Sequence, residues 1–233
     1  MADANYMQVV PTSLVLGGTK GLGAAIAEEC RANRDFVIRT GSSIMEDKTD
    51  GMVRDIPCDL NLLQDVHRMI KRIDDFEITM VDRFFWVAGR LLKGNLEDQS
   101  LRDVQETINI NFANPVLIAQ RIWKDMQRPN RKGHFVIISS SSGTNAREDE
   151  AIYVATKHAQ VGFARSLGME NKNPDVKVSL FMPGGMQTPF WDNNPQENFD
   201  EFLDPKKVAN KIVDTVLNQK EPYLEMAIPR KSL

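Results

Sequence analysis

Tyr153 and Lys157 stand four residues apart, at a spacing where a phenol and an ammonium can act together in proton transfer. Residues 151–171 contain no proline, and we predict that they form one helix with both side chains on the same face. A phenol has a reference pKa of about 10, and a neighbouring ammonium lowers that pKa by stabilising the phenolate. The pair could therefore serve as a general acid or base. An ordinary surface pair has the same spacing, so other stretches must decide between the two interpretations.

Four consecutive serines, Ser139 to Ser142, stand just ahead of this helix. They follow residues 134–138, which are apolar from Phe135 onward and predict a buried strand. Ligands of open α/β sheets bind at the carboxyl ends of the strands. We therefore expect the serines to lie at the edge of the sheet where a ligand would bind.

A glycine-rich turn lies near the start of the chain. The short apolar stretch 12–16 runs into Gly17, Gly21 and Gly23, and residues 24–30 are strongly helical. A dinucleotide-binding fingerprint requires this order of strand, glycine turn and helix, because the backbone must approach a pyrophosphate at the helix N-terminus. A structural connection between a strand and a helix could use the same glycines, but the flanking pattern favours nucleotide binding.

The end of the next predicted strand, residues 36–40, indicates which dinucleotide would bind. An acidic residue at this place would bind the ribose 2′-hydroxyl of NAD, and the sequence has none there. Lys20 in the glycine loop, Arg39 at the strand end, and Ser42 and Ser43 beyond it are better suited to a 2′-phosphate. The sequence therefore predicts NADP(H), with NAD(H) less expected.

Strands and helices alternate along the whole chain, which predicts a Rossmann-type doubly wound parallel sheet of about seven strands in a three-layer α/β/α arrangement. The predicted strands are residues 12–16, 36–40, 56–60, 81–87, 134–138, 176–182 and 221–228. The predicted helices are residues 24–30, 61–75, 101–126, 151–171 and 204–217. Residues 44–55 are polar and leave little room for another helix. No repeat or linker divides the chain, so residues 1–233 are expected to form a single domain.

Two of these helices and one further segment carry more specific expectations. Asn61 is predicted to cap the helix over residues 61–75, and Pro115 to mark a kink in the helix over residues 101–126. A buried asparagine at Asn111 needs hydrogen-bond partners, and is more often structural than catalytic. The aromatic segment 188–203 could be a lid over a partly apolar substrate pocket, or its aromatic side chains could pack into the core.

Composition and charge exclude several classes of protein. The 233 residues carry a net charge of −3, without the basic patch that binds nucleic acid or anionic membranes. No apolar run approaches the roughly 18 residues of a membrane span, and residues 1–11 lack the pattern of a signal peptide, so a cytoplasmic location is expected. Cys30 and Cys58 are the two cysteines, and they form no CxxC motif. Neither a disulfide framework nor a metal site is expected.

Taken together, these motifs resemble the short-chain dehydrogenase/reductase family over nearly the whole chain. Ser140 stands 13 residues before Tyr153, and with Asn111 and Lys157 these residues match the catalytic tetrad of that family. The resemblance implies that the following residues contact the cofactor: Gly17, Thr19, Lys20, Gly21, Leu22, Gly23, Ser42, Asp59, Ala88, Gly89, Lys157, Pro183, Gly184 and Thr188. Lys20 matches a basic position of NADP-preferring members, and Asp59 the acid beside the adenine.

Two positions depart from the family pattern. Leu16 stands where the family usually has threonine, and Trp86 with Val87 where it usually has paired asparagines. These changes remove a hydroxyl and an amide that tie the sheet edge to neighbouring loops. Neither position donates a proton in the family mechanism, so catalysis is not excluded.

The resemblance implies an NADP(H)-dependent oxidoreductase that interconverts a carbonyl and an alcohol on a small molecule. Tyr153 would donate the proton, Ser140 would hydrogen-bond the carbonyl oxygen, and Lys157 would lower the tyrosine pKa and bind the ribose. Asn111 would hold a water that relays protons to the lysine. A homodimer or homotetramer is expected from the same resemblance.

Two alternatives remain open at this point. An epimerase or dehydratase of the extended type shares the glycine loop and the Tyr153–Lys157 motif, but 233 residues leave no room for its larger substrate domain. A non-catalytic NADP-binding sensor or scaffold would keep the fold, but it would need the glycine loop alone. Redox turnover would separate this alternative from an enzyme.

Overall fold

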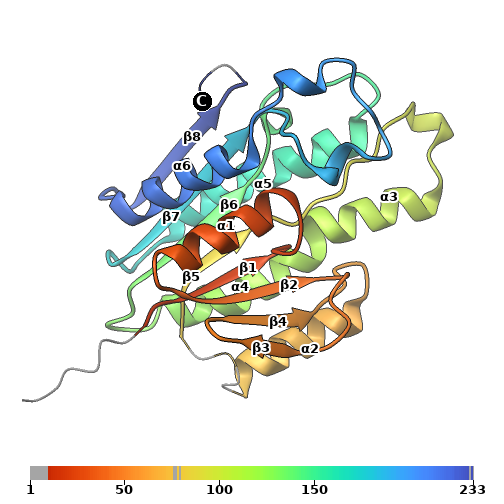
Figure 1. Ribbon diagram of the computed structural model, residues 1–233. Coiled ribbons are helices and arrows are strands. Elements are labelled where there is room, and N and C mark those ends of the chain that lie inside the picture. The colour runs from red at the N-terminus through yellow and green to blue at the C-terminus, as the bar shows by residue number, and fades with distance from the viewer. Residues whose placement is uncertain (1–9, 76–77, 79, 231, 233) are drawn as a thin grey trace, which may run out of the picture.

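A computed structural model describes residues 10–75, 78, 80–230 and 232. The amino-terminal stretch that was considered for a signal peptide lies almost wholly outside these residues. The described chain builds one twisted sheet with helices on both faces (Figure 1). The predicted doubly wound α/β fold is therefore confirmed.

The sheet has eight strands in the order β3-β4-β2-β1-β5-β6-β7-β8. All neighbouring strands are parallel except β3 and β4, which are antiparallel. The strands are β1 (Thr12–Leu16), β2 (Phe36–Gly41), β3 (Lys48–Asp50), β4 (Val53–Pro57), β5 (Val81–Trp86), β6 (Gly133–Ile138), β7 (Val176–Pro183) and β8 (Tyr223–Ile228). The order reverses at β1, which places a topological switch point between β1 and β5.

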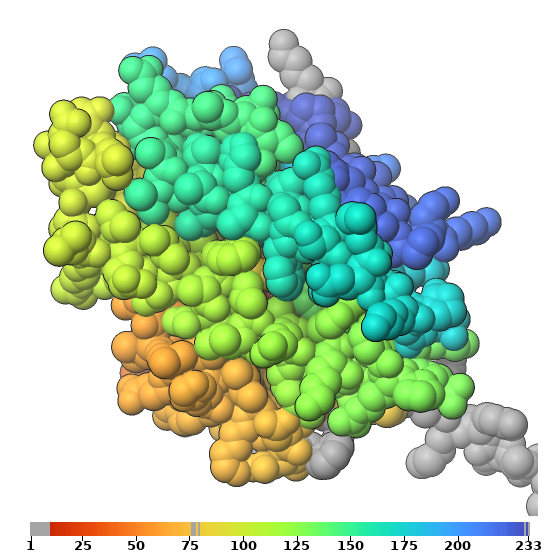
Figure 2. Space-filling model, turned by 180° about the vertical axis from the view of Figure 1, so that it is seen from behind, coloured from red at the N-terminus to blue at the C-terminus, as the bar shows by residue number. Residues whose placement is uncertain are grey.

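The helices form the two outer layers. They are α1 (Gly21–Ala32), α2 (Leu63–Asp74), α3 (Leu101–Ile108), α4 (Asn114–Met126), α5 (Ala151–Glu170) and α6 (Pro205–Asn218). The pair α1 and α6 covers one face of the sheet, and α2, α4 and α5 cover the other, which Figure 2 shows from outside.

Each face of the sheet has its own hydrophobic core, because the central strands are apolar on both sides. Leu14 and Leu16 of β1 point into the core beneath α2, α4 and α5, whereas Val15 between them points into the core beneath α1 and α6. All three side chains are fully buried. This alternation is the two-residue period of a strand that is covered on both faces.

The sequence prediction missed β3 and misplaced β4. Lys48–Asp50 pairs with Val53–Pro57 through a tight turn in which Gly51 has φ of 57°. All three residues of β3 are exposed and polar, so no apolar alternation marked them as a strand. A short, charged edge strand of this kind discourages pairing with another chain. The strand predicted at residues 56–60 begins earlier, at Val53.

The start of α2 also differs from the prediction. The expected cap at Asn61 is wrong, because the helix begins at Leu63 and no side chain caps it. The backbone N–H of Asn61 instead donates to Oδ1 of Asp59 at 2.8 Å, and that of Leu62 donates to the Asp59 carbonyl at 3.0 Å. Asp59 therefore organises the turn that leads into the helix.

The long helix predicted over residues 101–126 is interrupted by a π-helical segment, Asn109–Ala113 (η2). Pro115 lies just beyond it, in the first turn of α4, and has no N–H to donate. In a regular α-helix that N–H would bind the carbonyl of Asn111, four residues earlier. The Asn111 carbonyl instead accepts a hydrogen bond from Nε2 of Gln160 at 2.8 Å. The predicted irregularity is present, and its form is a widened turn.

Candidate active site

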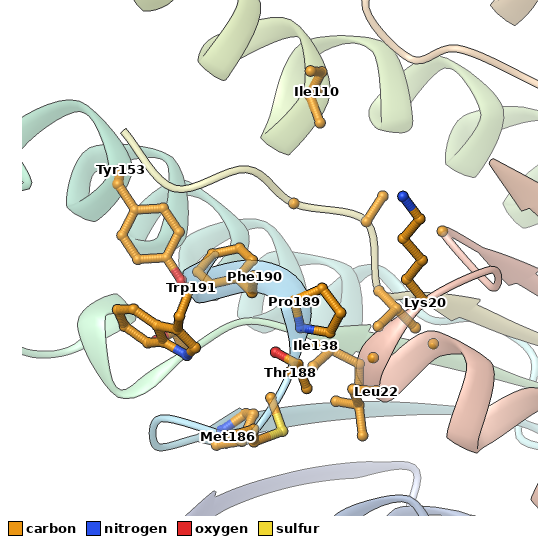
Figure 3. A pocket seen from close by; sticks show the side chains of 18 of the residues that line it. Lys20, Leu22, Ile110, Ile138, Tyr153, Met186, Thr188, Pro189, Phe190 and Trp191 are labelled. Atoms are coloured by element: carbon orange, nitrogen blue, oxygen red, sulfur yellow. The ribbon is translucent and has the colours of Figure 1, made fainter. Parts of the chain in front are cut away.

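A cavity of about 690 Å³ opens at the carboxyl ends of the central strands. The segments that follow β1, β5, β6 and β7 line it, as the topology of the sheet requires. Figure 3 shows Tyr153, Phe190 and Trp191 at one end of the cavity, and Lys20 with Leu22 at the other. Of the site residues that the sequence predicted, Asn111 and two of the candidates for a 2′-phosphate, Arg39 and Ser43, do not line this cavity, and all the others do.

The glycine loop forms the floor of one end. Gly17 has φ of 86°, a conformation that side-chain-bearing residues rarely adopt, and a Cβ there would lie 2.7 Å from Cα of Ala88. A Cβ on Gly23 would lie 2.0 Å from the carbonyl oxygen of Gly17. The close approach of loop, helix and β5 segment therefore depends on the absence of side chains at these two positions.

The N-terminus of α1 faces this cavity, and no side chain of the described residues caps it. Lys20 occupies the N-cap position, its side chain makes no capping hydrogen bond, and the first turn contains no acidic residue. The first N–H groups of a helix need acceptors, and their partial positive charge attracts anions. Together with the space above the glycines, this arrangement fits the diphosphate of a dinucleotide.

Only some of the residues that were expected to bind a 2′-phosphate at the end of β2 are free to do so. Ser42 and exposed Lys20 line the cavity, and Ser43 donates to Oγ1 of Thr19 at 3.3 Å. Arg39 does not line it, because its guanidinium binds both carboxylate oxygens of Asp55, each at 2.7 Å. The register of β2 and β4 places these two residues side by side. Because Arg39 is paired with Asp55, Lys20 is the cation at the end of β2 that can bind a 2′-phosphate.

Cys58 and Asp59 line the cavity beyond this strand end. Burial raises the pKa of the Cys58 thiol to about 12, so the thiol stays protonated at neutral pH and is a poor nucleophile. The Asp59 carboxylate holds the turn into α2, and its backbone N–H donates to Asp65 at 3.0 Å. These contacts fix the position of Asp59 at the cavity wall.

Tyr153, Lys157 and Ser140 converge at the other end of the cavity. Tyr153 and Lys157 lie on α5 and are 6% and 4% exposed. The Lys157 ammonium lies 5.8 Å from the centre of the tyrosine ring and donates to the Ile138 carbonyl at 3.3 Å. Ser140 follows β6, and its hydroxyl accepts from the N–H of Ser142 at 3.1 Å. The strand end and the helix face thus meet at one place.

Burial is the main cause of the shifted pKa values of Tyr153 and Lys157. It raises the pKa of Tyr153 to about 12, an effect that a hydrogen bond with Ser140 opposes and the Glu150 carboxylate reinforces. Burial also lowers the pKa of Lys157 to about 7. The expected lowering of the tyrosine pKa by the lysine is therefore absent from this structure. A lysine that is partly neutral near pH 7 stabilises a phenolate less than a full positive charge would.

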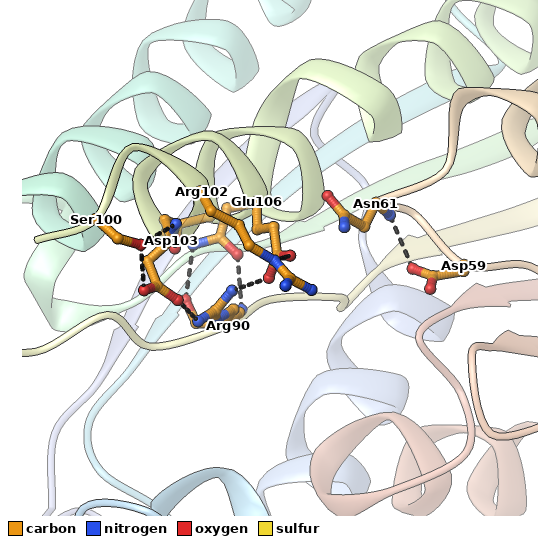
Figure 4. Close-up of polar contacts among 9 residues, drawn as sticks. Asp59, Asn61, Arg90, Ser100, Arg102, Asp103 and Glu106 are labelled. Atoms are coloured by element: carbon orange, nitrogen blue, oxygen red, sulfur yellow. Dashed lines mark hydrogen bonds and ion pairs between the residues drawn. The ribbon is translucent and has the colours of Figure 1, made fainter.

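Asn111 is fully buried behind the cavity wall and does not reach into the cavity. Its Oδ1 accepts from the N–H of Arg90 at 2.6 Å, and its Nδ2 donates to the Arg90 carbonyl and to Oγ1 of Thr156, both at 2.9 Å. The Arg90 guanidinium in turn binds Asp103 and Glu106 on α3 (Figure 4). Asn111 therefore holds the segment after β5 against α3 and α5.

The two departures from the family pattern are accommodated by backbone and aromatic contacts. The carbonyl of Leu16 accepts from the N–H groups of Val87 and Ala88, at 3.0 and 2.8 Å. Trp86 is fully buried among Phe112 and Phe163, with ring centres 6.1 and 5.8 Å away. Among the described residues its indole N–H has no hydrogen-bond partner. Backbone hydrogen bonds tie the sheet edge where side chains were expected to do so.

The aromatic residues of the segment 188–203 divide between the two roles left open by the sequence. Phe190 and Trp191 line the cavity, and the Phe190 ring lies 6.0 Å from that of Tyr153. Phe202 is 5% exposed and packs edge-on against Trp191 at 5.3 Å. The segment therefore presents an aromatic wall to the cavity and anchors that wall from behind.

Gln160 is the polar residue at this site that the sequence prediction missed. It is fully buried on α5, and its Oε1 accepts from the Lys157 ammonium at 3.0 Å. Its position seven residues after Tyr153 is the signal that could have found it, because positions i, i+4 and i+7 share one helix face.

The part of the chain that the structure describes contains no candidate metal site and no candidate membrane span. Within it, no group of three or more histidine, cysteine or acidic residues is placed to hold a metal ion. Within the same residues, no helix has the length and apolar character needed to cross a membrane.

Comparison with known protein families gave one family match. The model of the family described as short chain dehydrogenase matches residues 11–198. Among similar proteins, the sepiapterin reductase of Chlorobaculum tepidum is 26% identical over 232 residues, which cover 93% of this chain and 94% of that protein. The 3-oxoacyl-(acyl-carrier-protein) reductase MabA of Mycobacterium tuberculosis is 26% identical over 223 residues, which cover 92% of this chain and 88% of that protein.

Similar folds occur among solved structures. A 4-hydroxyisoleucine dehydrogenase mutant in complex with NADH and succinate has a TM-score of 0.83 at 20% identity, covering 95% of this chain and 98% of that chain. ElxO with bound NADP has a TM-score of 0.81 at 20% identity, covering 96% of this chain and 98% of that chain. At these identities the likeness concerns the fold.

Proposed function

Because the chain belongs to the short-chain dehydrogenase family, we propose that it is an oxidoreductase that interconverts a carbonyl and an alcohol with NADP(H). The observation that carries this proposal is the convergence of Tyr153, Ser140 and Lys157 on the cavity that the glycine loop also lines. A sensor or scaffold would need only the loop, so the buried acid–base group favours an enzyme.

When bound, a nicotinamide dinucleotide supplies or accepts the hydride. The uncapped N-terminus of α1 and the glycine loop would hold its diphosphate, with Asp59, Ala88 and Gly89 along the wall. Pro183, Gly184 and Thr188 line the opposite side. The chemistry left to the protein is orientation of the reacting groups, and proton transfer.

Tyr153 is the proposed proton donor to the developing alkoxide. Its pKa of about 12 keeps the phenol protonated at neutral pH, as reduction of a carbonyl requires. Ser140 lies beside it to hydrogen-bond the carbonyl oxygen, and the Lys157 ammonium is placed to stabilise the phenolate left after proton transfer. Phe190 and Trp191 cover this end and would exclude water from it.

The preference for NADP(H) rests on Lys20 and Ser42. Both line the cavity beside the end of β2, where no acidic side chain among the described residues stands ready for a ribose hydroxyl. The Asp55 carboxylate is close by, but it is engaged by Arg39. The similar solved structures carry NADP in one case and NADH in another, so the preference depends on these residues of the chain itself.

The substrate is proposed to be a small carbonyl or alcohol compound with a partly apolar body. The aromatic wall of Phe190 and Trp191 beside Tyr153 supports this class. The sepiapterin reductase and the 3-oxoacyl reductase among the similar proteins are both named as reductases, which favours reduction as the physiological direction.

We also propose that residues 1–233 form a single domain and assemble as a homodimer or homotetramer. Partly buried apolar side chains on η2, α4 and α5, among them Phe112, Val116 and Phe163, support an interface on that side. A cytoplasmic location stays a prediction from the sequence.

Replacing Tyr153 by phenylalanine tests the catalytic assignment. The variant should lose at least about 100-fold in kcat with a panel of ketones and aldehydes, because the general acid is removed, while NADPH fluorescence still reports binding. Tyr223→Phe is the matched control, since that hydroxyl donates to Glu225 on β8 at 3.0 Å and lies outside the cavity lining. Substantial turnover by Tyr153→Phe would refute the assignment. Binding of NADPH without turnover by the wild type would favour the sensor.

A titration with NADPH and NADH, followed by cofactor fluorescence, tests the cofactor preference. NADPH should bind more tightly, and Lys20→Ala should weaken NADPH about tenfold through loss of a charge-assisted contact to the 2′-phosphate. Binding of NADH to the same variant should stay within twofold or so of the wild type. Equal loss for both cofactors would show that Lys20 does not read the 2′-phosphate.

A further inference from the structure

The side-chain amide of Gln160 links two groups that the proposed reaction depends on. Its Oε1 accepts from Nζ of Lys157 at 3.0 Å, and its Nε2 donates to the backbone carbonyl of Asn111 at 2.8 Å. Gln160 is fully buried, and so is Asn111. An amide buried at this depth needs partners at both ends, and here both ends are engaged.

The orientation of this amide follows from the chemistry of its partners. An ammonium can only donate, and a carbonyl can only accept. The oxygen of Gln160 must therefore face Lys157, and its nitrogen must face Asn111. The Asn111 carbonyl is available for this contact because Pro115 has no N–H to offer it.

The bridge occupies the path where a water was expected. The resemblance implied that Asn111 holds a water that relays protons to Lys157. In the structure the Asn111 side chain binds Arg90 and Thr156, and its carbonyl binds Gln160. A neutral amide does not exchange its protons for those of its partners near pH 7. It can fix an orientation, but it cannot carry a proton along this path.

We propose that Gln160 is a positioning residue for proton transfer, an inference that rests on the proposed function. Its amide holds the Lys157 ammonium beneath Tyr153, in place of a water link to Asn111. Two of the three ammonium hydrogens are then directed to Gln160 and to the Ile138 carbonyl. The third is left for the cavity that Lys157 lines. Proton exchange with solvent must run through the cavity, because the rear of the lysine is closed.

The surroundings of Lys157 make this bridge measurable. Among the described residues, the groups facing it from other elements are neutral: the Ile138 carbonyl of β6, Gly89 after β5, and Gln160 with Asn111 behind it. Tyr153 on the same helix is the one titratable neighbour, and burial is the cause of the lowered pKa of Lys157. A change at Gln160 therefore acts on Lys157 without competition from another charged side chain.

The test uses two substitutions with opposite electrostatic effects. Gln160→Met keeps the shape and removes the acceptor, so the lysine should deprotonate at a lower pH, by about one unit. Gln160→Glu keeps an acceptor and adds a negative charge, so the lysine should deprotonate at a higher pH. The readout is the pH titration of the Lys157 ¹³Cε resonance in the cofactor-free protein, with Lys157→Met to assign the signal.

A purely structural role would disturb both variants alike and would not move the two midpoints in opposite directions. Midpoints that stay at the wild-type value in both folded variants would overturn the proposal, and so would shifts of the same sign. If Gln160→Met fails to fold, Gln160→Glu alone decides by the direction of its shift. The titration needs no substrate, so it is independent of whether Tyr153→Phe supports the oxidoreductase. With an active substrate, the pH profile of kcat should move in the same directions.

Discussion

Replacing Lys157 by methionine should change how the stability of the cofactor-free protein depends on pH. Burial lowers the pKa of Lys157 from 10.5 to about 7 in the folded protein. Between these two values the unfolded chain binds more protons than the folded one, so the free energy of unfolding rises with pH. Below about pH 7 both states are protonated, and the folded state bears the full cost of a buried ammonium.

The magnitude follows from the size of the shift. One pKa unit corresponds to about 1.4 kcal/mol, so the whole shift is worth on the order of 4–5 kcal/mol. Between pH 6 and pH 9 the wild type should regain about 2–3 kcal/mol relative to Lys157→Met. The variant also loses the hydrogen bonds to Ile138 and Gln160. That loss is nearly the same at every pH, so it cancels when the two pH values are compared.

Urea denaturation of both proteins at pH 6, 7, 8 and 9, followed by tryptophan fluorescence, measures this difference. The stability of the wild type relative to the variant should increase steadily across the series. A stability difference that is the same at pH 6 and pH 9 would refute the reasoning, because it would mean that the lysine has the same proton affinity in the folded and unfolded protein. A decrease with pH would mean that the folded protein favours the ammonium.

Two glycine substitutions give further predictions with opposite outcomes. Gly23→Ala should abolish tight NADPH binding, because its Cβ would lie 2.0 Å from the carbonyl oxygen of Gly17 and the loop would have to move; an unchanged dissociation constant in a fluorescence titration would contradict this. Gly162→Ala on α5 has nothing within 4 Å of its new Cβ. It should stabilise the protein by about 0.5–1 kcal/mol in urea denaturation and leave NADPH binding unchanged, and destabilisation would count against it.

The layered fold could be predicted because most elements carry a pattern of their own. The buried strands are short apolar runs, and α2 repeats apolar residues at helical spacing. The edge strand β3 carries no such pattern, since its three residues are polar and exposed. The cap expected at Asn61 failed for another reason, because Asp59 binds the Asn61 N–H in a turn that precedes the helix, and α2 begins only at Leu63.

The site could be predicted in its residues but less well in its contacts. The resemblance to the short-chain dehydrogenase family implied that Ser140, Tyr153 and Lys157 act together, and the structure brings them to one cavity. The pairing of Arg39 with Asp55 depends on the register between β2 and β4, which local sequence does not specify. The direction of the tyrosine pKa depends on burial by other elements, which spacing on one helix cannot reveal.

Asn111 shows how a residue outside the cavity can control what happens inside it. Its side chain holds the backbone of Arg90, and so places Gly89 against the lysine, where a Cβ would lie 3.4 Å from Nζ of Lys157. Its backbone carbonyl holds Gln160, and through it the same ammonium. The two functions are separable, because a side-chain substitution removes the first and leaves the carbonyl. The carbonyl contact depends instead on Pro115, whose missing N–H leaves that oxygen for α5. The widened turn next to Pro115 is therefore part of how the lysine is held.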